Sequence, residues 1–231
     1  MSNKLLALIV AGSCLVVSAH AALDPQSGFT STTLYDTTGS GDVIEGLAID
    51  GDDAYFGQAL DVNSINLDTT MVSLEGSLPA NVSVGFVERA TGTTYAAYTT
   101  SFASPFPGIV GSLTPGGMFN ITSGADGIFD AAVNSLGELY YVANPGALGS
   151  MIFRLETDGT STLVVDAGGF SGGLAFDRFD NLYYAYQAPF PGVPYISKFT
   201  SAQVAAGGLV LADNVDIIPL SVSYLAFDPH D

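Results

Sequence analysis

The hydrophobic and polar positions of this 231-residue chain follow a short, regular rhythm. From residue 22 onward, brief runs rich in Val, Ile, Tyr, Phe and Thr alternate with clusters of Gly, Asp, Asn, Ser and Pro. Apolar runs of this kind, bounded by turn residues, are typical of β-strands. No stretch after residue 22 has the sustained periodicity of about 3.6 residues that marks an amphipathic helix. The pattern therefore predicts an all-β domain over residues 22–231.

One strand–turn–strand motif recurs along the chain. Its clearest copy has an apolar–Ala–apolar–Asp stretch at 174–177, a polar turn, and an aromatic strand at 182–186. Related copies begin near residues 47, 131 and 225. A weaker copy at 84–98 also matches the second hairpin of a unit, so its place in the repeat stays open.

Two hairpins make one repeat of four strands. The second hairpin is seen twice, because residues 113–117 resemble residues 155–159. Four strands in about 40–45 residues is the size of one blade of a β-propeller. The sequence thus predicts a propeller of four-stranded blades. The predicted units lie near 45–80, 81–124, 129–166 and 172–213, with a part-unit at 223–231.

The two ends of the repeat array are unequal. Residues 30–36 resemble a lone fourth strand, and the part-unit at 223–231 holds one strand. An unpaired sheet edge is an aggregation liability. We therefore expect a propeller that is incomplete at its C-terminus because the chain is a fragment; the alternative is a ring that is left open.

The repeat resembles a known family. Residues 173–177 followed by residues 180–183 are similar to the recurring pattern of NHL and gluconolactonase-like propellers, and the resemblance covers roughly residues 30–231. It implies the propeller fold. The chain also resembles exported bacterial surface proteins of this repeat type, which carry a C-terminal sorting tail.

The N-terminus has the features of a signal peptide. Lys4 precedes an apolar stretch at 5–17, and the small-x-small sequence at 19–21 fits a cleavage site. The sequence before Cys14 does not fit a lipoprotein. We expect residues 1–21 to be removed and the protein to be exported, to the periplasm, the cell surface or the medium.

The charge balance excludes several classes of partner. The chain has a net charge of −18, and four basic residues besides Lys4 stand against 23 acidic ones. Nucleic acid is therefore not an expected partner. Beyond residue 21 the chain has no cysteine, and its one histidine is His230. A Ser-His-Asp triad and a histidine-rich zinc site are thus not expected, so any catalysis has to use carboxylates.

The resemblance also implies a metal site. Lactonase-type propellers hold one divalent metal on the axis through Glu, Asp and Asn just before the inner strands. Glu45 and Asp130 match those positions, whereas the third counterpart is Gly172-Gly173. A hard oxygen-ligated cation needs about six oxygens. We therefore expect no required cofactor, with calcium or another divalent cation at Glu45 and Asp130 as the candidate.

Three further patterns each have two interpretations. The acidic stretches at 50–53, 177–181 and 213–216 fit hairpin turns better than calcium loops. The repeated tyrosines of the aromatic strands fit packing between blades better than a carbohydrate-stacking rim. The Pro-rich loops at 101–108 and 188–194 are candidates for a binding face, since loops on rigid scaffolds carry function. The candidate residues in those loops are Phe106, Pro107, Phe190 and Pro191.

Two functions follow from these features. The first is a non-catalytic binding or scaffold module at the cell surface or in the periplasm, with an unidentified surface or carbohydrate partner. The alternative is a metal-dependent, lactonase-like hydrolase that uses carboxylates at the propeller axis. Carboxylates that converge on the axis would favour the enzyme.

Overall fold

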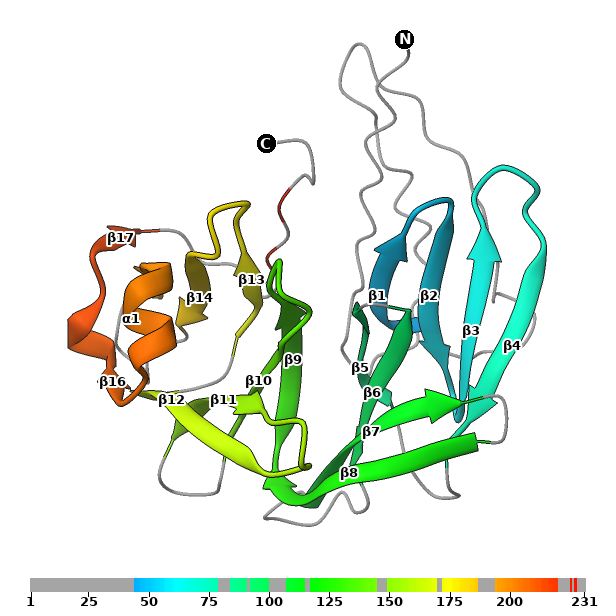
Figure 1. Ribbon diagram of the computed structural model, residues 1–231, viewed down its shortest axis with the longest axis horizontal. Coiled ribbons are helices and arrows are strands. Elements are labelled where there is room, and N and C mark those ends of the chain that lie inside the picture. The colour runs from blue at the N-terminus through cyan, green and yellow to red at the C-terminus, as the bar shows by residue number, and fades with distance from the viewer. Residues whose placement is uncertain are drawn as a thin grey trace, which may run out of the picture.

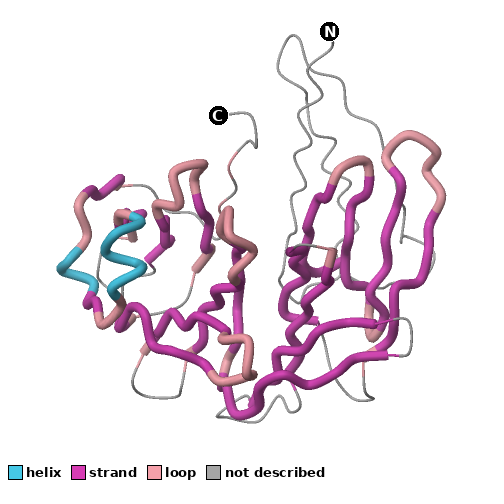
Figure 2. Tube along the Cα trace, in the orientation of Figure 1, coloured by secondary structure: helices cyan, strands magenta, loops and turns pink. Residues whose placement is uncertain are grey.

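The computed structural model describes ten stretches of the chain. They are residues 44–78, 84–90, 92–99, 107–114, 117–144, 149–169, 172–186, 194–219, 225 and 227. Within them, almost every element is a strand, as Figure 2 shows. The strands form four small sheets that follow one another around a common centre (Figure 1), so the predicted all-β propeller is confirmed. Residues 1–21, 30–36 and most of 223–231 lie outside the described residues.

Sheets 1 and 2 are plain antiparallel meanders, because each strand turns back beside its predecessor. Sheet 1 contains β1 (Ile44–Asp50), β2 (Asp53–Gln58), β3 (Asp61–Asn66) and β4 (Val72–Ser77). Sheet 2 contains β5 (Val84–Ala90), β6 (Thr93–Thr99), β7 (Pro107–Thr114) and β8 (Gly117–Asp126). The weak copy at 84–98 therefore forms the first hairpin of its sheet.

Sheets 3 and 4 follow the same plan with one addition. Sheet 3 contains β9 (Ile128–Val133), β10 (Leu139–Ala143), β11 (Ser150–Leu155), β12 (Ser161–Gly168) and β16 (Leu209–Val210). Sheet 4 contains β13 (Leu174–Phe176), β14 (Leu182–Tyr186), β15 (Tyr195–Phe199) and β17 (Asp216–Ile218). Because β16 joins β12 in parallel, sheet 3 has five strands instead of the expected four.

The extra strand follows a helix that the sequence pattern missed. Helix α1 (Ser201–Ala206) is too short for helical periodicity to be visible, but Thr200 and Gln203 cap it reciprocally. Its Val204 is buried in the apolar cluster between sheets 3 and 4. A 3₁₀ turn, Leu211–Asp213, then leads toward β17. The helix thus covers the outer part of sheet 3, and the chain that follows it places β16 at the edge of that sheet.

The first strand of each sheet lies innermost. Along the chain, β1 contacts β5, β5 contacts β9, and β9 contacts β13. Successive side chains of a strand point to opposite faces, so each inner strand serves two interfaces. Val87 packs in the cluster between sheets 1 and 2, and Phe86 packs in the cluster between sheets 2 and 3. The fold therefore brings inner-strand residues of consecutive sheets together at the centre.

The tyrosine of the second strand repeats one contact between blades. For Tyr55 and Tyr140, the ring meets the side chain at the same ladder position on the inner strand of the next sheet, and the ring of Tyr183 meets that of Phe227. These contacts support packing, and not a carbohydrate rim, for Tyr140 and Tyr183. The pairs are Tyr55 with the Arg89 guanidinium (4.6 Å), Tyr140 with Phe176 (4.9 Å) and Tyr183 with Phe227 (4.7 Å).

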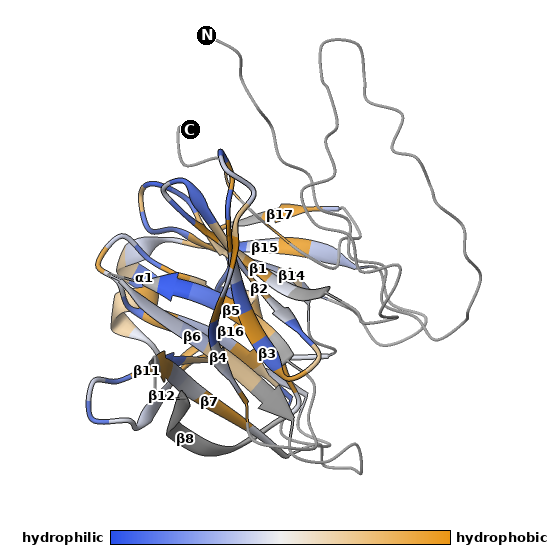
Figure 3. Cartoon of the chain, turned by 90° about the vertical axis from the view of Figure 1, so that its right-hand side faces the viewer, coloured by the Kyte–Doolittle hydropathy of each residue, from blue (hydrophilic) through white to orange (hydrophobic). Residues whose placement is uncertain are grey.

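Polar residues gather at the hairpin ends. Figure 3 shows these ends in blue and the strands largely in paler colours and orange. Asp50 and Asp53 pair across a tight turn in which Gly51 has φ of +61°. Asp177 accepts hydrogen bonds from the N–H groups of Phe179 and Asn181, both at 2.9 Å. The acidic stretches at 50–53 and 177–181 are therefore hairpin turns.

No helix within the described residues combines the length and the apolar character needed to cross a bilayer.

Candidate active site

Asp130 lies on the inner strand β9, where its carboxylate links two sheets. Its Oδ2 atom accepts a hydrogen bond from the N–H of Leu174, on β13 of sheet 4, at 2.8 Å. The neighbouring ladder bond runs from the N–H of Ala185 to the carbonyl of Gly173. Since hydrogen-bonded pairs alternate along an antiparallel ladder, the N–H of Leu174 points away from β14. It is therefore free to bind Asp130.

The approach of β13 to β14 depends on a glycine. A Cβ at Gly172 would clash with the carbonyl oxygen of Ala185. With Gly172, β13 lies close enough to β14 for this part of the ladder to form. The sequence GG, which cannot supply a metal ligand from its side chains, thus has a structural role.

Glu88, on the neighbouring inner strand β5, faces the same region. It lies two residues after Phe86 and therefore on the face that packs toward sheet 3. The negative charge of Asp130 helps to raise the pKa of the Glu88 carboxyl. Both residues are half-buried as a whole, with their carboxyl groups set deep among protein atoms.

Burial changes the acidity of both carboxyl groups. It raises the pKa of Asp130 from 3.8 to about 7, although the N–H groups of Leu174 and Ala131 act in the opposite direction. Burial and the charge of Asp130 raise the pKa of Glu88 well above its usual range. The hydrogen bond from the backbone N–H of Arg89 acts in the opposite direction. Two adjacent carboxyl groups with raised pKa values in the interior of a fold are typical of functional sites.

Glu45 contributes a third inner strand. It lies on β1, where it pairs with Gly57 in the same ladder row as Asp130 with Val142. Gly46 follows it with φ of +68°, and a Cβ there would clash with the backbone N of Val87, so β1 approaches β5 closely. The side chain of Glu45 lies outside the described part of the chain. The fold thus brings the strands of the two predicted residues, Glu45 and Asp130, to either side of β5.

Glu88 is the residue that sequence reasoning missed. The repeat alignment gave candidates on sheets 1 and 3, Glu45 and Asp130, and none on sheet 2. The available signal was an acidic residue inside an apolar inner strand, in the run Val-Gly-Phe-Val-Glu. An acid in such a strand has to be buried, paired or functional.

The structure does not describe the side chains of the candidate binding-face residues. Phe106, Phe190 and Pro191 lie outside the described residues, and Pro107 begins β7 without a described side chain. The binding face therefore stays a prediction.

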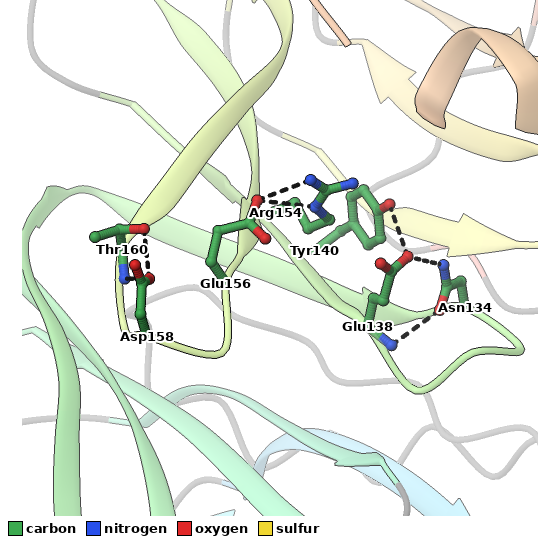
Figure 4. Close-up of polar contacts among 7 residues, drawn as sticks. All are labelled: Asn134, Glu138, Tyr140, Arg154, Glu156, Asp158 and Thr160. Atoms are coloured by element: carbon green, nitrogen blue, oxygen red, sulfur yellow. Dashed lines mark hydrogen bonds and ion pairs between the residues drawn. The ribbon is translucent and has the colours of Figure 1, made fainter. Parts of the chain in front are cut away.

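A second group of carboxylates lies at the hairpin ends of sheet 3 (Figure 4), where each has a partner. Glu156 binds Arg154, with Oε1 at 2.9 Å from Nη2. Glu138 accepts hydrogen bonds from Asn134 Nδ2 (2.6 Å) and from the Tyr140 hydroxyl (3.3 Å). Asp158 accepts two hydrogen bonds from Thr160. These contacts fix the turns.

The described residues do not fit a divalent metal. No group of three or more His, Cys, Asp or Glu side chains comes together among them. One oxygen of Asp130 is already bound by Leu174, and Gly173 stands at the sheet 4 position where the family pattern has a ligand. Asp130 and Glu88 alone fall well short of about six oxygens.

Comparison with known proteins gives relatives only by structure. The sequence matches no family model, and no curated protein matches it significantly. Among solved structures it is similar to a luciferin-regenerating enzyme, with a TM-score of 0.59, 12% identity, and coverage of 80% of this chain and 66% of that one. A gluconolactonase from Xanthomonas campestris gives a TM-score of 0.59, 14% identity, and coverage of 81% and 66%.

A third neighbour is a PQQ-bound aldose sugar dehydrogenase from Streptomyces coelicolor, with a TM-score of 0.55, 14% identity, and coverage of 68% and 60%. This chain therefore spans less than two thirds of the length of each of these neighbours. At such low identity the likeness establishes the propeller fold, of the kind that gluconolactonase has.

The expectation of a non-catalytic binding or scaffold module has to be corrected. These neighbours are enzymes, and they fit the alternative, a lactonase-like enzyme, better than a scaffold. The expectation rested on the small number of axial ligands visible in the sequence. It overlooked Glu88, and with it the pair of carboxyl groups on adjacent inner strands.

Proposed function

We propose that this chain is the catalytic part of a lactonase-like hydrolase whose acid–base chemistry is carried by Asp130 and Glu88. The observation that carries the proposal is the position of these two buried carboxyl groups on the contacting inner strands β5 and β9. The enzyme neighbours support it, since one is a gluconolactonase. A pair of carboxyl groups with raised pKa values can supply the general acid and the general base that such a reaction uses.

The two carboxyl groups suit complementary roles. Asp130, with a pKa of about 7, is partly ionised near neutral pH and can accept a proton from an attacking water. Glu88, whose pKa is raised well above its usual range by burial and by the charge of Asp130, can supply a proton.

In the proposed step, the water oxygen bonds to the lactone carbonyl carbon while its proton passes to Asp130. The bond between that carbon and the ring oxygen then breaks, and the leaving oxygen takes a proton from Glu88. The product is the open hydroxy acid. Transfer of a proton from Asp130 to Glu88 through solvent restores the starting state.

None of these steps involves a metal, because the described side chains do not make up a metal site. Calcium at Glu45 and Asp130 stays a prediction that rests on the family resemblance.

Initial rates of D-glucono-1,5-lactone hydrolysis, measured by pH-stat above the spontaneous rate, test the proposed function. We expect Asp130→Asn and Glu88→Gln each to lower kcat by about 100-fold or more. Both changes keep the size of the side chain and remove its proton chemistry. Glu156→Gln is the matched control, since Glu156 lies in the turn network away from the axis. Wild-type rates that both substitutions leave unchanged would refute the assignment.

We also propose that the protein is exported. Support comes from the signal-peptide features of residues 1–21 in the sequence. Mass spectrometry of the protein recovered outside the cytoplasm should find an N-terminus at Ala22. Recovery with Met1 or Lys4 still attached would refute cleavage.

A further inference from the structure

The basic residues of the described chain all lie away from the axial carboxyl groups. Besides Lys4, the chain has four Lys and Arg residues, and all four are described. Lys4 and both histidines lie outside the described residues. Each of the four has a described partner that is not Asp130 or Glu88. The partners are Asp50 and Tyr55 for Arg89, Glu156 for Arg154, Phe179 for Arg178, and Tyr183 for Lys198.

Arg89 is adjacent to Glu88 in sequence but serves another interface. Its Nε binds Asp50 Oδ2 at 3.1 Å, and its Nη1 donates to Thr94 at 2.8 Å. Because side chains alternate along β5, the guanidinium points toward sheet 1 while Glu88 points toward sheet 3. The charge of Arg89 is thus directed away from the site.

The electrostatic effects agree with this geometry. A basic side chain helps to lower the pKa of Glu156, after a hydrogen bond from Thr162, and the charge of Lys198 helps to lower the pKa of Asp177. No basic side chain acts in this way on Asp130 or on Glu88. The described surroundings of the axial pair contain no cation.

The backbone donors near the pair are occupied as well. Leu174 and Ala131 donate their N–H groups to Asp130, and Arg89 donates its N–H to Glu88. Backbone N–H groups are the other common way for a protein to bind an anion. Here the protein's own carboxyl groups already take up those donors.

We propose that the axial site takes uncharged, hydroxyl-bearing substrates and rejects anionic ones such as phosphorylated or carboxylated sugar derivatives. The inference deepens the proposed function and rests on it, because it names the substrate class of the same site. The charge at the site is zero or negative in every protonation state of the pair. An anionic substrate would therefore meet like charge without a compensating partner.

The test compares D-glucono-1,5-lactone with its 6-phosphate on the full chain. We expect kcat/KM to be at least about 100-fold lower for the phosphate, since like charges at close range cost several kcal/mol. Salt should narrow the ratio, because the Debye length falls from about 30 Å at 0.01 M to about 8 Å at 0.15 M. Equal kcat/KM for the two lactones would overturn the inference and leave the proposed function standing.

Two variants sharpen the comparison. Asp130→Asn removes the group that carries the negative charge of the pair near neutral pH and keeps the shape of the site, so the ratio between the two lactones should fall even though both rates drop. Glu156→Gln makes the same change in the turn network and should leave the ratio as it is. A ratio that changes equally in both variants would show that the overall charge of the protein, and not the site, discriminates.

If neither lactone is hydrolysed, the proposed function fails, and binding then decides the inference separately. D-glucose and D-glucose 6-phosphate are titrated into the labelled protein, and the amide signals of Ala131 and Leu174 are followed by NMR. Shifts with glucose alone would support the inference. Shifts with the phosphate, or with neither sugar, would overturn it.

Discussion

The carboxylates at the hairpin ends and those at the inner strands differ in one respect, the supply of partners. In the turns, Glu156 has an arginine, Glu138 has an amide and a hydroxyl, and Asp177 has Asn181 and the N–H of Phe179. At the axis, Asp130 has backbone N–H groups, and Glu88 has one backbone N–H and the like charge of Asp130. Glu156 and Asp177 are thus stabilised in their ionised form, whereas the axial pair is held toward its protonated form.

The comparison shows where in this fold a carboxyl group has a raised pKa. A turn faces solvent and can recruit polar neighbours from its own few residues. An inner strand is enclosed by the strands of the next sheets, so its carboxyl group loses water without gaining a cation. Four experiments test that difference, from the largest expected effect to the smallest.

Asp130→Asn should stabilise the protein at alkaline pH. The folded pKa of Asp130, about 7, lies above its ordinary value of 3.8. The stability that this group contributes is therefore fully present below about pH 4 and is lost as pH rises through about 7. Asn keeps an oxygen for the N–H of Leu174 and cannot ionise. At pH 8 the variant should gain about 2–4 kcal/mol, since one pKa unit corresponds to about 1.4 kcal/mol.

Urea unfolding at pH 4 and pH 8 measures this effect. At pH 4 the two proteins should be nearly equal. The control Glu156→Gln should show no gain at pH 8. An Asp130→Asn protein that is less stable than wild type at pH 8 would contradict the raised pKa of Asp130 in the folded protein.

Asp177→Ala should destabilise the protein, which is the opposite of the effect expected for Asp130→Asn. The pKa of Asp177 is lowered: burial acts upward, but the hydrogen bonds from Asn181 and Phe179 and the charge of Lys198 outweigh it. Removing the carboxylate should cost about 1–2 kcal/mol at pH 7, because it leaves the turn's donors without an acceptor. The contribution is lost as pH falls below about 3.8, through the folded pKa, so the cost should shrink in acid. Asp177→Asn, which keeps one acceptor oxygen, should cost less, and an equal loss in both variants would argue against these bonds.

The sequence predicted the turn region better than the axis. The motif at 174–186 contains its own explanation, because the apolar residues form the strands and Asp177 with Asn181 closes the turn between them. The surroundings that raise the pKa of Glu88 form only when sheets 2, 3 and 4 pack together, and that arrangement depends on contacts between residues far apart in sequence. Helix α1 lies between these cases. The capping pair Thr200 and Gln203 is visible in the sequence, but six residues are too few to show the hydrophobic periodicity of a helix.

Arg89→Ala should weaken the interface between sheets 1 and 2 by about 1 kcal/mol, through loss of its contact with the Tyr55 ring and of its half-exposed ion pair with Asp50. Arg178→Ala is the matched control, since Arg178 is exposed and lies over the exposed ring of Phe179. Its loss should change stability by less than about 0.5 kcal/mol. Equal melting temperatures for the two variants would remove Arg89 from the interface.

The smallest effect is expected from calcium. A ligand that binds only the folded protein stabilises it by an amount that grows with the logarithm of 1 + [L]/Kd, so even a millimolar site would raise the melting temperature at sufficiently high calcium. Asp130 has one oxygen engaged by Leu174, and Gly173 supplies no side chain at the next sheet. The weakest common calcium sites have dissociation constants of about 1 mM, so about 10 mM calcium would fill even such a site. We expect this concentration to leave the melting temperature almost unchanged. Glu45→Gln should behave like wild type in this titration. A rise of several degrees that Glu45→Gln abolishes would show instead that Glu45 completes a metal site with Asp130, and that the axial carboxylates, like those in the turns, have a cation as their partner.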